Sequence, residues 1–166
     1  DLKSLTILNL SKNPQLTSLP VEIFEALNNL RILDLSEGNF TMLPIGLFQG
    51  LNNLTSLYLG GSGLTILPVG LFHGLKSLTL LDLRWNSQLK SLPVNVFQGL
   101  ESLAELKLDA NYKLTILSKG IFKGLKSLTS LSLGWCAKLT TLPTGVFQEL
   151  ESLTSLDLFS SPFTTL

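Results

Sequence analysis

The stretch Leu78–Leu100, which reads LTLLDLRWNSQLKSLPVNVFQGL, decides the fold because variants of it fill the whole chain of 166 residues. It opens with the pattern Leu-x-x-Leu-x-Leu. This pattern returns at steps of 24 or 25 residues, and a fixed period of that length is the signature of a repeat architecture. The seven copies begin at Leu5, Leu30, Leu54, Leu78, Leu103, Leu128 and Leu153.

Each copy predicts one strand followed by a return path. Alternating leucines such as Leu81 and Leu83 bury one face of a strand and present the other to solvent. Strands one repeat apart then pair as a parallel sheet. On the return path every complete copy carries a phenylalanine, after which a short turn of 3₁₀ or α-helix is expected. The phenylalanines are predicted to stack as a buried column; they are Phe24, Phe48, Phe72, Phe97, Phe122 and Phe147.

These patterns resemble the leucine-rich repeat. The ending Leu-Pro-x-Gly-x-Phe-x-Gly-Leu, as in residues 43–51, is similar to the "typical" subclass of many extracellular animal receptors and matrix proteins. The resemblance implies a right-handed α/β solenoid with a seven-strand parallel sheet on the concave face and short turns or 3₁₀ segments on the convex side. Residues 1–166 would then be a single domain of six full repeats and a partial seventh. The cysteine-rich caps of such receptors are missing.

Both ends of the chain fall inside a repeat, so the sequence is interpreted as a fragment of a longer solenoid. Solenoids normally need polar capping repeats. We therefore expect a poor monomer that makes end-to-end contacts through its uncapped repeats. Three glycosylation sequons occur, of which Asn39 and Asn53 are the better candidates because Asn9 falls on the concave face. They favour an extracellular or cell-surface location, although the compartment stays unknown.

The turn after each strand carries its backbone polar groups into the interior. A buried side-chain amide can both donate and accept hydrogen bonds there, and an asparagine fills this ladder position in three repeats. The other four turns must satisfy their backbone by other means, and those repeats are expected to be weaker. The ladder residues are Asn13, Gly38, Ser62, Asn86, Asn111, Cys136 and Ser161.

Composition removes several classes of function. The formal net charge is zero, with 12 basic and 12 acidic side chains, which disfavours nucleic acid and membrane surfaces as partners. No apolar run reaches the roughly 18 residues of a membrane span. The single cysteine, Cys136, excludes an internal disulfide and a multi-cysteine metal site. The single histidine, His73, is three repeats from Cys136 and is expected to be an exposed filler, so no catalytic residue, metal or cofactor is predicted.

The residues that differ between repeats are the outward strand positions and the two residues that follow. Trp85 and Trp135 occupy equivalent places two repeats apart, with an expected spacing of about 10 Å, and exposed tryptophan beside arginine is typical of interface hot spots. The alternative is that each indole packs locally over the adjacent turn. The predicted ligand-binding residues of the concave face are Tyr58, Asp82, Arg84, Trp85, Glu105, Lys107, Asp109, Trp135 and Phe159.

The sequence therefore favours a non-enzymatic recognition module that binds a protein or a large glycan through its concave sheet. Two alternatives stay open. The chain is otherwise a structural subunit of a larger assembly that makes contacts through its ends, edges or convex side, or the repeat segment of a multidomain signalling protein.

Overall fold

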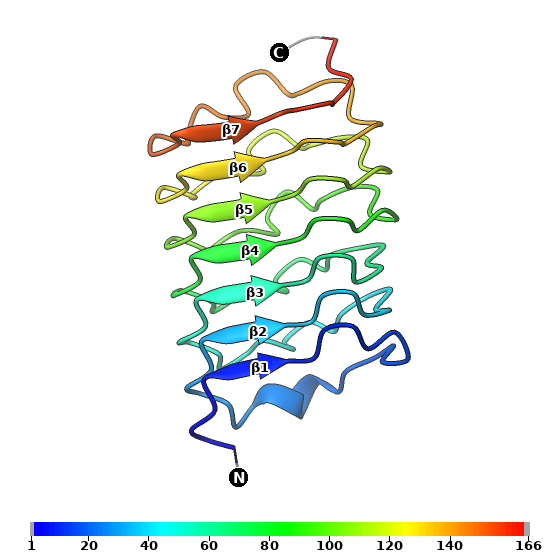
Figure 1. Ribbon diagram of the computed structural model, residues 1–166. Coiled ribbons are helices and arrows are strands. Elements are labelled where there is room, and N and C mark those ends of the chain that lie inside the picture. The colour runs from blue at the N-terminus through cyan, green and yellow to red at the C-terminus, as the bar shows by residue number, and fades with distance from the viewer. Residues whose placement is uncertain (1, 165–166) are drawn as a thin grey trace.

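The computed structural model describes residues 2–164, which form a right-handed coil with one strand in each turn (Figure 1). The strands are three residues long and form a single parallel sheet in sequence order. Their register is that of the leucine pattern, with Leu33 beside Leu57 and Leu57 beside Leu81. The strands are β1 (Ile7–Asn9), β2 (Ile32–Asp34), β3 (Ser56–Tyr58), β4 (Leu80–Asp82), β5 (Glu105–Lys107), β6 (Ser130–Ser132) and β7 (Ser155–Asp157).

The predicted burial pattern is confirmed in the inner strands other than β4, where the outward Asp82 is also buried; in the edge strand β7 the central Leu156 is 40% exposed. In β2, β3, β5 and β6 the central leucine is buried and its two neighbours are partly exposed on the outer face. The ladder also continues past each strand. The N–H of Trp85, for example, donates to the carbonyl of Asp109 in the next repeat at 3.0 Å.

The phenylalanine column is confirmed as well. Neighbouring rings are nearly parallel, with centroids 6.2–6.5 Å apart. Phe24, Phe48, Phe72, Phe97 and Phe122 are at most 1% exposed, whereas Phe147 at the end of the column is only partly buried. Because strands in a sheet lie only about 4.8 Å apart, the stack is longer on the phenylalanine side. The sheet therefore lines the concave face and the phenylalanines lie under the convex one.

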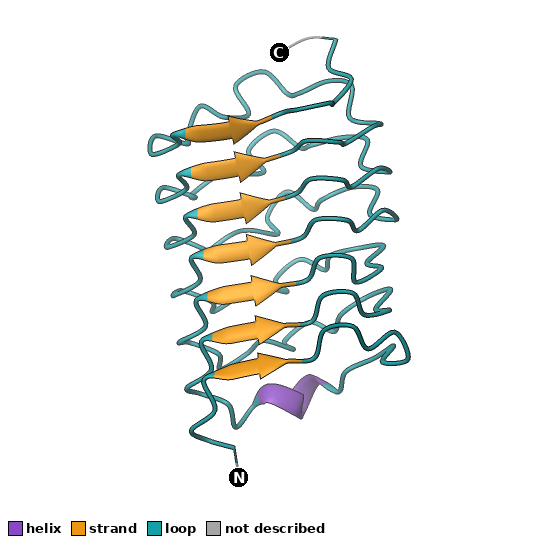
Figure 2. Cartoon of the chain, viewed as in Figure 1, coloured by secondary structure: helices purple, strands orange, loops and turns teal. Residues whose placement is uncertain are grey.

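The short turn predicted after each phenylalanine is present, but it does not extend into a helix. One 3₁₀ helix, η1 (Val21–Phe24), occurs within residues 2–164, and it ends at the phenylalanine (Figure 2). After Phe48 there is only a single turn, closed by the N–H of Leu51 and the Phe48 carbonyl. The cause is glycine on both sides of the ring: Gly46 and Gly50 have φ of 85° and 87°, which a right-handed helix cannot contain.

Different side chains at the ladder position donate to the equivalent backbone carbonyl, that of the last leucine in the strand motif of the preceding repeat. Asn86 Nδ2 donates to Leu59 O in the preceding repeat at 2.9 Å. Ser62 Oγ makes the equivalent bond to Leu35 O at 2.8 Å, and Cys136 Sγ lies 3.5 Å from Leu108 O. The "other means" expected for the non-asparagine repeats are thus a hydroxyl or thiol in the same place. At Gly38 the ring of Phe40 fills the space instead, 2.5 Å from where a Cβ would lie.

The amide oxygens of two buried ladder asparagines have different surroundings. Asn86 Oδ1 accepts the N–H of Leu64 at 3.0 Å. Asn111 Oδ1 has no partner among the described residues. The difference follows from repeat length. Leu89 is the counterpart of Leu64 in a 25-residue repeat, and the extra residue there closes a turn in which the Leu89 N–H donates to the Asn86 carbonyl. This N–H is therefore not free to donate to Asn111.

Truncating Phe97 to alanine should lower the free energy of unfolding by about 3 to 5 kcal/mol, because the ring lies in the middle of the column and its removal leaves a cavity. Chemical denaturation measures the loss. The exposed neighbour Gln98→Ala is the control and should change stability by less than about 0.5 kcal/mol. Equal effects of the two substitutions would contradict a buried column.

The ladder gives a second prediction. Serine keeps a donor for the preceding carbonyl, as Ser62 shows, but removes the amide oxygen. Asn86→Ser should therefore destabilise the chain by about 1 to 3 kcal/mol more than Asn111→Ser. Only the substitution of Asn86 leaves a buried N–H, that of Leu64, without a partner. Equal losses in parallel denaturation curves would mean that the Leu64 contact contributes nothing.

Candidate binding surface

The concave surface is defined here as the outward residues of the strands together with the two residues after the leucine that ends each strand motif. All nine sequence-predicted binding residues belong to it. Their exposure differs widely, from 4% for Asp82 to 59% for Trp85 and 65% for Phe159. Tyr58, Arg84, Glu105, Lys107 and Asp109 are partly buried and Trp135 is exposed.

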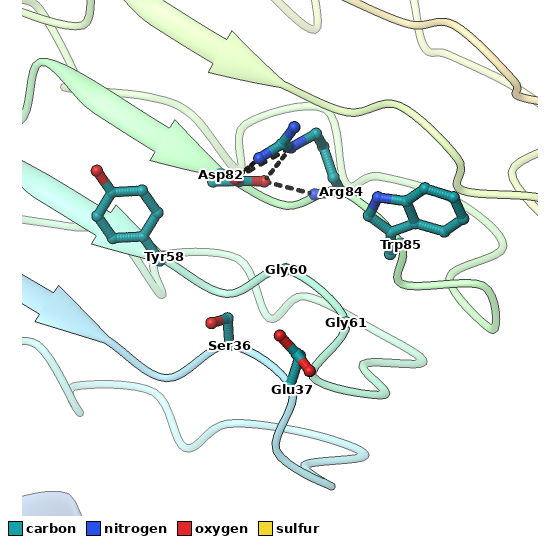
Figure 3. A pocket seen from close by; sticks show the side chains of 8 residues that line it. All are labelled: Ser36, Glu37, Tyr58, Gly60, Gly61, Asp82, Arg84 and Trp85. Atoms are coloured by element: carbon teal, nitrogen blue, oxygen red, sulfur yellow. Dashed lines mark hydrogen bonds and ion pairs between the residues drawn. The ribbon is translucent and has the colours of Figure 1, made fainter. Parts of the chain in front are cut away.

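A hollow of about 410 Å³ brings four of these residues together. Figure 3 shows the side chains of Tyr58 and Trp85 on its two sides and the bonded pair of Asp82 and Arg84 between them. Four further residues, which the sequence did not single out as a site, complete the lining: Ser36, Glu37, Gly60 and Gly61. The other predicted residues, Glu105, Lys107, Asp109, Trp135 and Phe159, lie outside this hollow.

Several carboxylates of the surface stabilise the turn after the strand. Asp82 Oδ1 accepts the N–H of Arg84 at 3.0 Å, and Asp157 does the same for Phe159 at 2.8 Å. In β6 the equivalent position is Ser132, and here Asp109 of the previous repeat accepts both the Ser132 hydroxyl and the Gly134 N–H. The two-residue bonds of Asp82 and Asp157 are those of Asx turns, whereas Asp109 links two repeats. Asp82 and Asp109 are therefore already engaged with backbone N–H groups of the chain.

Asp82 and Arg84 also form the closest ion pair of the surface. Arg84 Nη2 lies 2.6 Å from Asp82 Oδ2, and Nε lies 3.0 Å from both carboxylate oxygens. The hydrogen bond to Asp82 and its negative charge raise the pKa of Arg84 despite partial burial. Lys107 pairs with Glu105 at 3.1 Å. The pairing of Lys12 and Glu37 is looser, at 3.9 Å, with side chains 73% and 61% exposed.

The concave surface is acidic although the whole chain is neutral. Six carboxylates and three cationic side chains lie on it, a net charge of −3, against zero for the full sequence. The carboxylates are those of Asp34, Glu37, Asp82, Glu105, Asp109 and Asp157, and the cations are Lys12, Arg84 and Lys107.

The sequence left open whether the two tryptophans are exposed or packed locally, and both are partly true. Trp85 is 59% and Trp135 50% exposed, yet each makes an edge-to-face aromatic contact. Trp85 meets Tyr112 with centroids 6.0 Å apart, and Trp135 meets Phe159 at 5.6 Å. The sequence analysis did not name Tyr112, which follows the ladder residue Asn111; its aromatic ring was the available signal.

Both tryptophans have left-handed backbones, with φ of 61° and 58°. The repeat imposes this conformation, because Lys12, Glu37 and Ala110 at the same place have φ of 58°, 52° and 57°. A bulky residue there costs roughly 1 kcal/mol or more.

The structure places the two candidate nucleophilic or basic side chains apart. His73 is exposed on the return path, as expected of a filler. Cys136 is fully buried, which raises the pKa of its thiol to about 11. Among residues 2–164, no group of three or more His, Cys, Asp and Glu side chains is arranged to hold a metal ion, and no helix there has the length and apolarity to cross a membrane.

The sequence profile described as "Leucine rich repeat" matches residues 3–64, 28–87, 85–137 and 105–163, so the matches together run through nearly the whole chain. The chain belongs to the leucine-rich repeat family. The resemblance noted from the sequence is thus confirmed, and with it the solenoid fold. Among curated proteins, none matches this leucine-rich repeat chain.

Solved structures of other leucine-rich repeat proteins superpose closely. The Drosophila Toll receptor in complex with Spatzle has a TM-score of 0.89 and 31% identity over 98% of this chain, which spans 21% of the Toll chain. TLR13 in complex with a single-stranded RNA gives 0.74 and 30%, with 98% and 26% of the two chains covered. The repeat domain of the type III effector XopL gives 0.81 and 30%, with 97% and 54% covered. This leucine-rich repeat chain therefore spans about a fifth to a half of these relatives.

Both glycosylation candidates of the leucine-rich repeat chain are exposed. Asn53 Nδ2 donates to the carbonyl of Asn28 at 2.8 Å, one repeat away, while Asn39 lies next to Gly38 in the turn after β2. Exposure is compatible with modification of either residue, and their use as acceptors stays a prediction.

The buried thiol gives a prediction about pH. The ordinary pKa is 9.0 and the folded value about 11, so between these values the unfolded chain loses the proton while the folded chain keeps it. Stability must therefore fall as pH rises through this window, by about 2 kcal/mol for this group. Cys136→Ser, which keeps a hydroxyl donor at the ladder position, is the control. Denaturation curves at both ends of the window that fall equally for the two proteins would contradict a buried neutral thiol.

Proposed function

We propose that the chain is a non-enzymatic recognition module that binds a protein partner on its concave surface. The observation that carries the proposal is the pair of tryptophans, Trp85 and Trp135. Each is at least half exposed in a strained backbone conformation, so neither is explained by core packing. Exposed tryptophan with few rotors to freeze is the side chain most typical of interface hot spots.

The size of the surface supports a protein partner. Seven repeats that each contribute four residues to the concave surface provide about the number of residues that a standard interface uses on one side. The leucines behind them are buried, so these outward residues differ between repeats without disturbing the stack. The Toll structure is a complex with the protein Spatzle, which supports the same class of partner.

Charge favours protein over nucleic acid. TLR13 was solved with single-stranded RNA, but proteins that bind RNA neutralise phosphates with lysine and arginine. The concave surface carries a net charge of −3, which repels a polyanion. A large glycan is the second ligand class, because aromatic side chains and carboxylates are also the groups that contact sugars, and it is an outcome of the experiment below.

The experiment locates the binding face before it measures affinity. A photo-crosslinking amino acid is placed at Ser130 on the concave surface or at Gln98 on the return path, in cells that express the chain. The proposal requires a protein that crosslinks from Ser130 and much less from Gln98. Crosslinks from Gln98 alone would favour the structural-subunit alternative, and capture of a glycan alone would favour the second ligand class.

With that partner purified, Trp85→Ala and Trp135→Ala should each weaken binding by about 2 kcal/mol or more, with little change in the thermal midpoint. Calorimetric titration measures the affinity. The matched controls are Ile116→Ala and Ile66→Ala, which are exposed to a similar extent, 59% and 49%, but lie off the concave surface. A loss of stability with affinity intact would assign both tryptophans to local packing.

A further inference from the structure

The hollow lined by Tyr58, Glu37 and Trp85 exists because its floor has no side chains. At the place of Gly60 the sixth repeat also has a glycine, Gly134, and the others carry a serine, arginine, aspartate or phenylalanine; at the place of Gly61 all other repeats have a side chain, as large as tryptophan in two of them. A Cβ at Gly60 would lie at ordinary to slightly tight contact distance, 3.4 Å, from Arg84 O and Asp82 Oδ1. The missing side chains therefore leave room for a group from outside the chain.

The walls of the hollow carry polar groups that the chain itself does not use. Within residues 2–164, neither the Tyr58 hydroxyl nor the Trp85 indole N–H makes a hydrogen bond. Figure 3 shows the two rings on opposite sides of the hollow, with the Glu37 carboxylate between them on the side of β2. Two aromatic rings and a carboxylate around an open space form the kind of site that attracts a cation.

The charge balance of the lining selects the same class of ligand. Asp82 and Arg84 neutralise each other through their ion pair, so Arg84 offers no uncompensated charge to an anion. Glu37 has only the loose contact with Lys12 at 3.9 Å between two exposed side chains, and such a pair contributes little. The lining thus carries one negative charge that is not balanced within it, inside a surface with a net charge of −3.

We propose that this hollow is the subsite that receives an arginine side chain of the protein partner. The inference rests on the proposed function and deepens it. The guanidinium donates two hydrogen bonds to the Glu37 carboxylate, in the hollow that the rings of Tyr58 and Trp85 border. Arginine fits better than lysine because its planar, weakly hydrated head group both stacks on aromatic faces and matches a carboxylate with two parallel donors.

The test uses N-acetyl-arginine methylamide as the probe and the chain labelled with ¹⁵N. Saturable shifts are expected at the Gly60 and Gly61 amides and at the Trp85 indole N–H, with a Kd in the millimolar range that suits one side chain. The neutral citrulline analogue is the control ligand and should produce no saturable shift at these sites. Equal binding of the two probes, or no saturable shift with the arginine probe, overturns the proposal.

Variants of the chain separate the contributions. Glu37→Gln should weaken the arginine probe about threefold to fivefold, as expected for a partly exposed ion pair, while Glu101→Gln outside the hollow should leave it unchanged. Gly60→Phe should abolish binding by filling the hollow; Arg84 shows that an inner repeat accepts a large side chain at this place, and Phe159 that the last repeat accepts phenylalanine. Ser11→Phe, at the same place in the first repeat, should have no effect. If both Glu37→Gln and Gly60→Phe bind the arginine probe as tightly as the unchanged chain does, the proposal is contradicted even though the probe binds.

The outcomes distinguish this inference from the proposed function. If the arginine probe fails while Trp135→Ala still weakens the protein partner, the concave surface binds that partner without an arginine subsite. If the probe binds as expected but partners crosslink only from Gln98, the hollow is a cation site and the proposed function is wrong.

Discussion

The whole structure depends on the burial of each repeat against the next one. A three-residue strand and a short return path cannot enclose an apolar core alone, so the leucines and the phenylalanine of one repeat must pack on those of its neighbour. Phe72, for example, stacks on both Phe48 and Phe97. This constraint fixes which side chains point inward and leaves the outward ones without a part in the stack. A binding surface can therefore differ from repeat to repeat on an unchanged frame.

A second constraint acts where the chain leaves the sheet. The residue before the ladder position has positive φ in every repeat from Lys12 to Ser160, and from Lys12 to Trp135 it donates its N–H to the next repeat. Acidic residues such as Asp82 and Asp157 accept the N–H two residues later. Some polar residues of the concave surface thus stabilise the turns of the fold. Glu37 and Tyr58 do not have such a role, which is why they are the better candidates for contact with a partner.

The period of the leucine pattern predicted the strands, their order and the phenylalanine column, because side-chain burial in a solenoid follows directly from spacing. It did not predict which polar groups would pair. The contact of Trp85 with Tyr112, the burial of Asp82 beneath Arg84 and the missing partner of Asn111 Oδ1 all depend on geometry between repeats. That geometry changes with the single extra residue of the 25-residue repeats, whose effect on neighbouring side chains cannot be obtained from spacing alone. The hollow was missed for a similar reason, since a pair of glycines shows no site until the side chains around it are placed.

The aromatic residues and the hollow together define how a partner would lie on the sheet. The hollow extends from the second to the fourth repeat, and the pairs Trp85–Tyr112 and Trp135–Phe159 continue the same edge to the seventh. These features lie at the carboxyl ends of the strands, where the backbone is held at positive φ. A partner that contacted only one of them would bury too little area for a stable complex, whereas one that contacted all of them would cross six repeats. The proposed interface is therefore an elongated contact along the strand ends, in which the aromatic pairs would supply apolar area and Glu37 in the hollow would select the partner by charge.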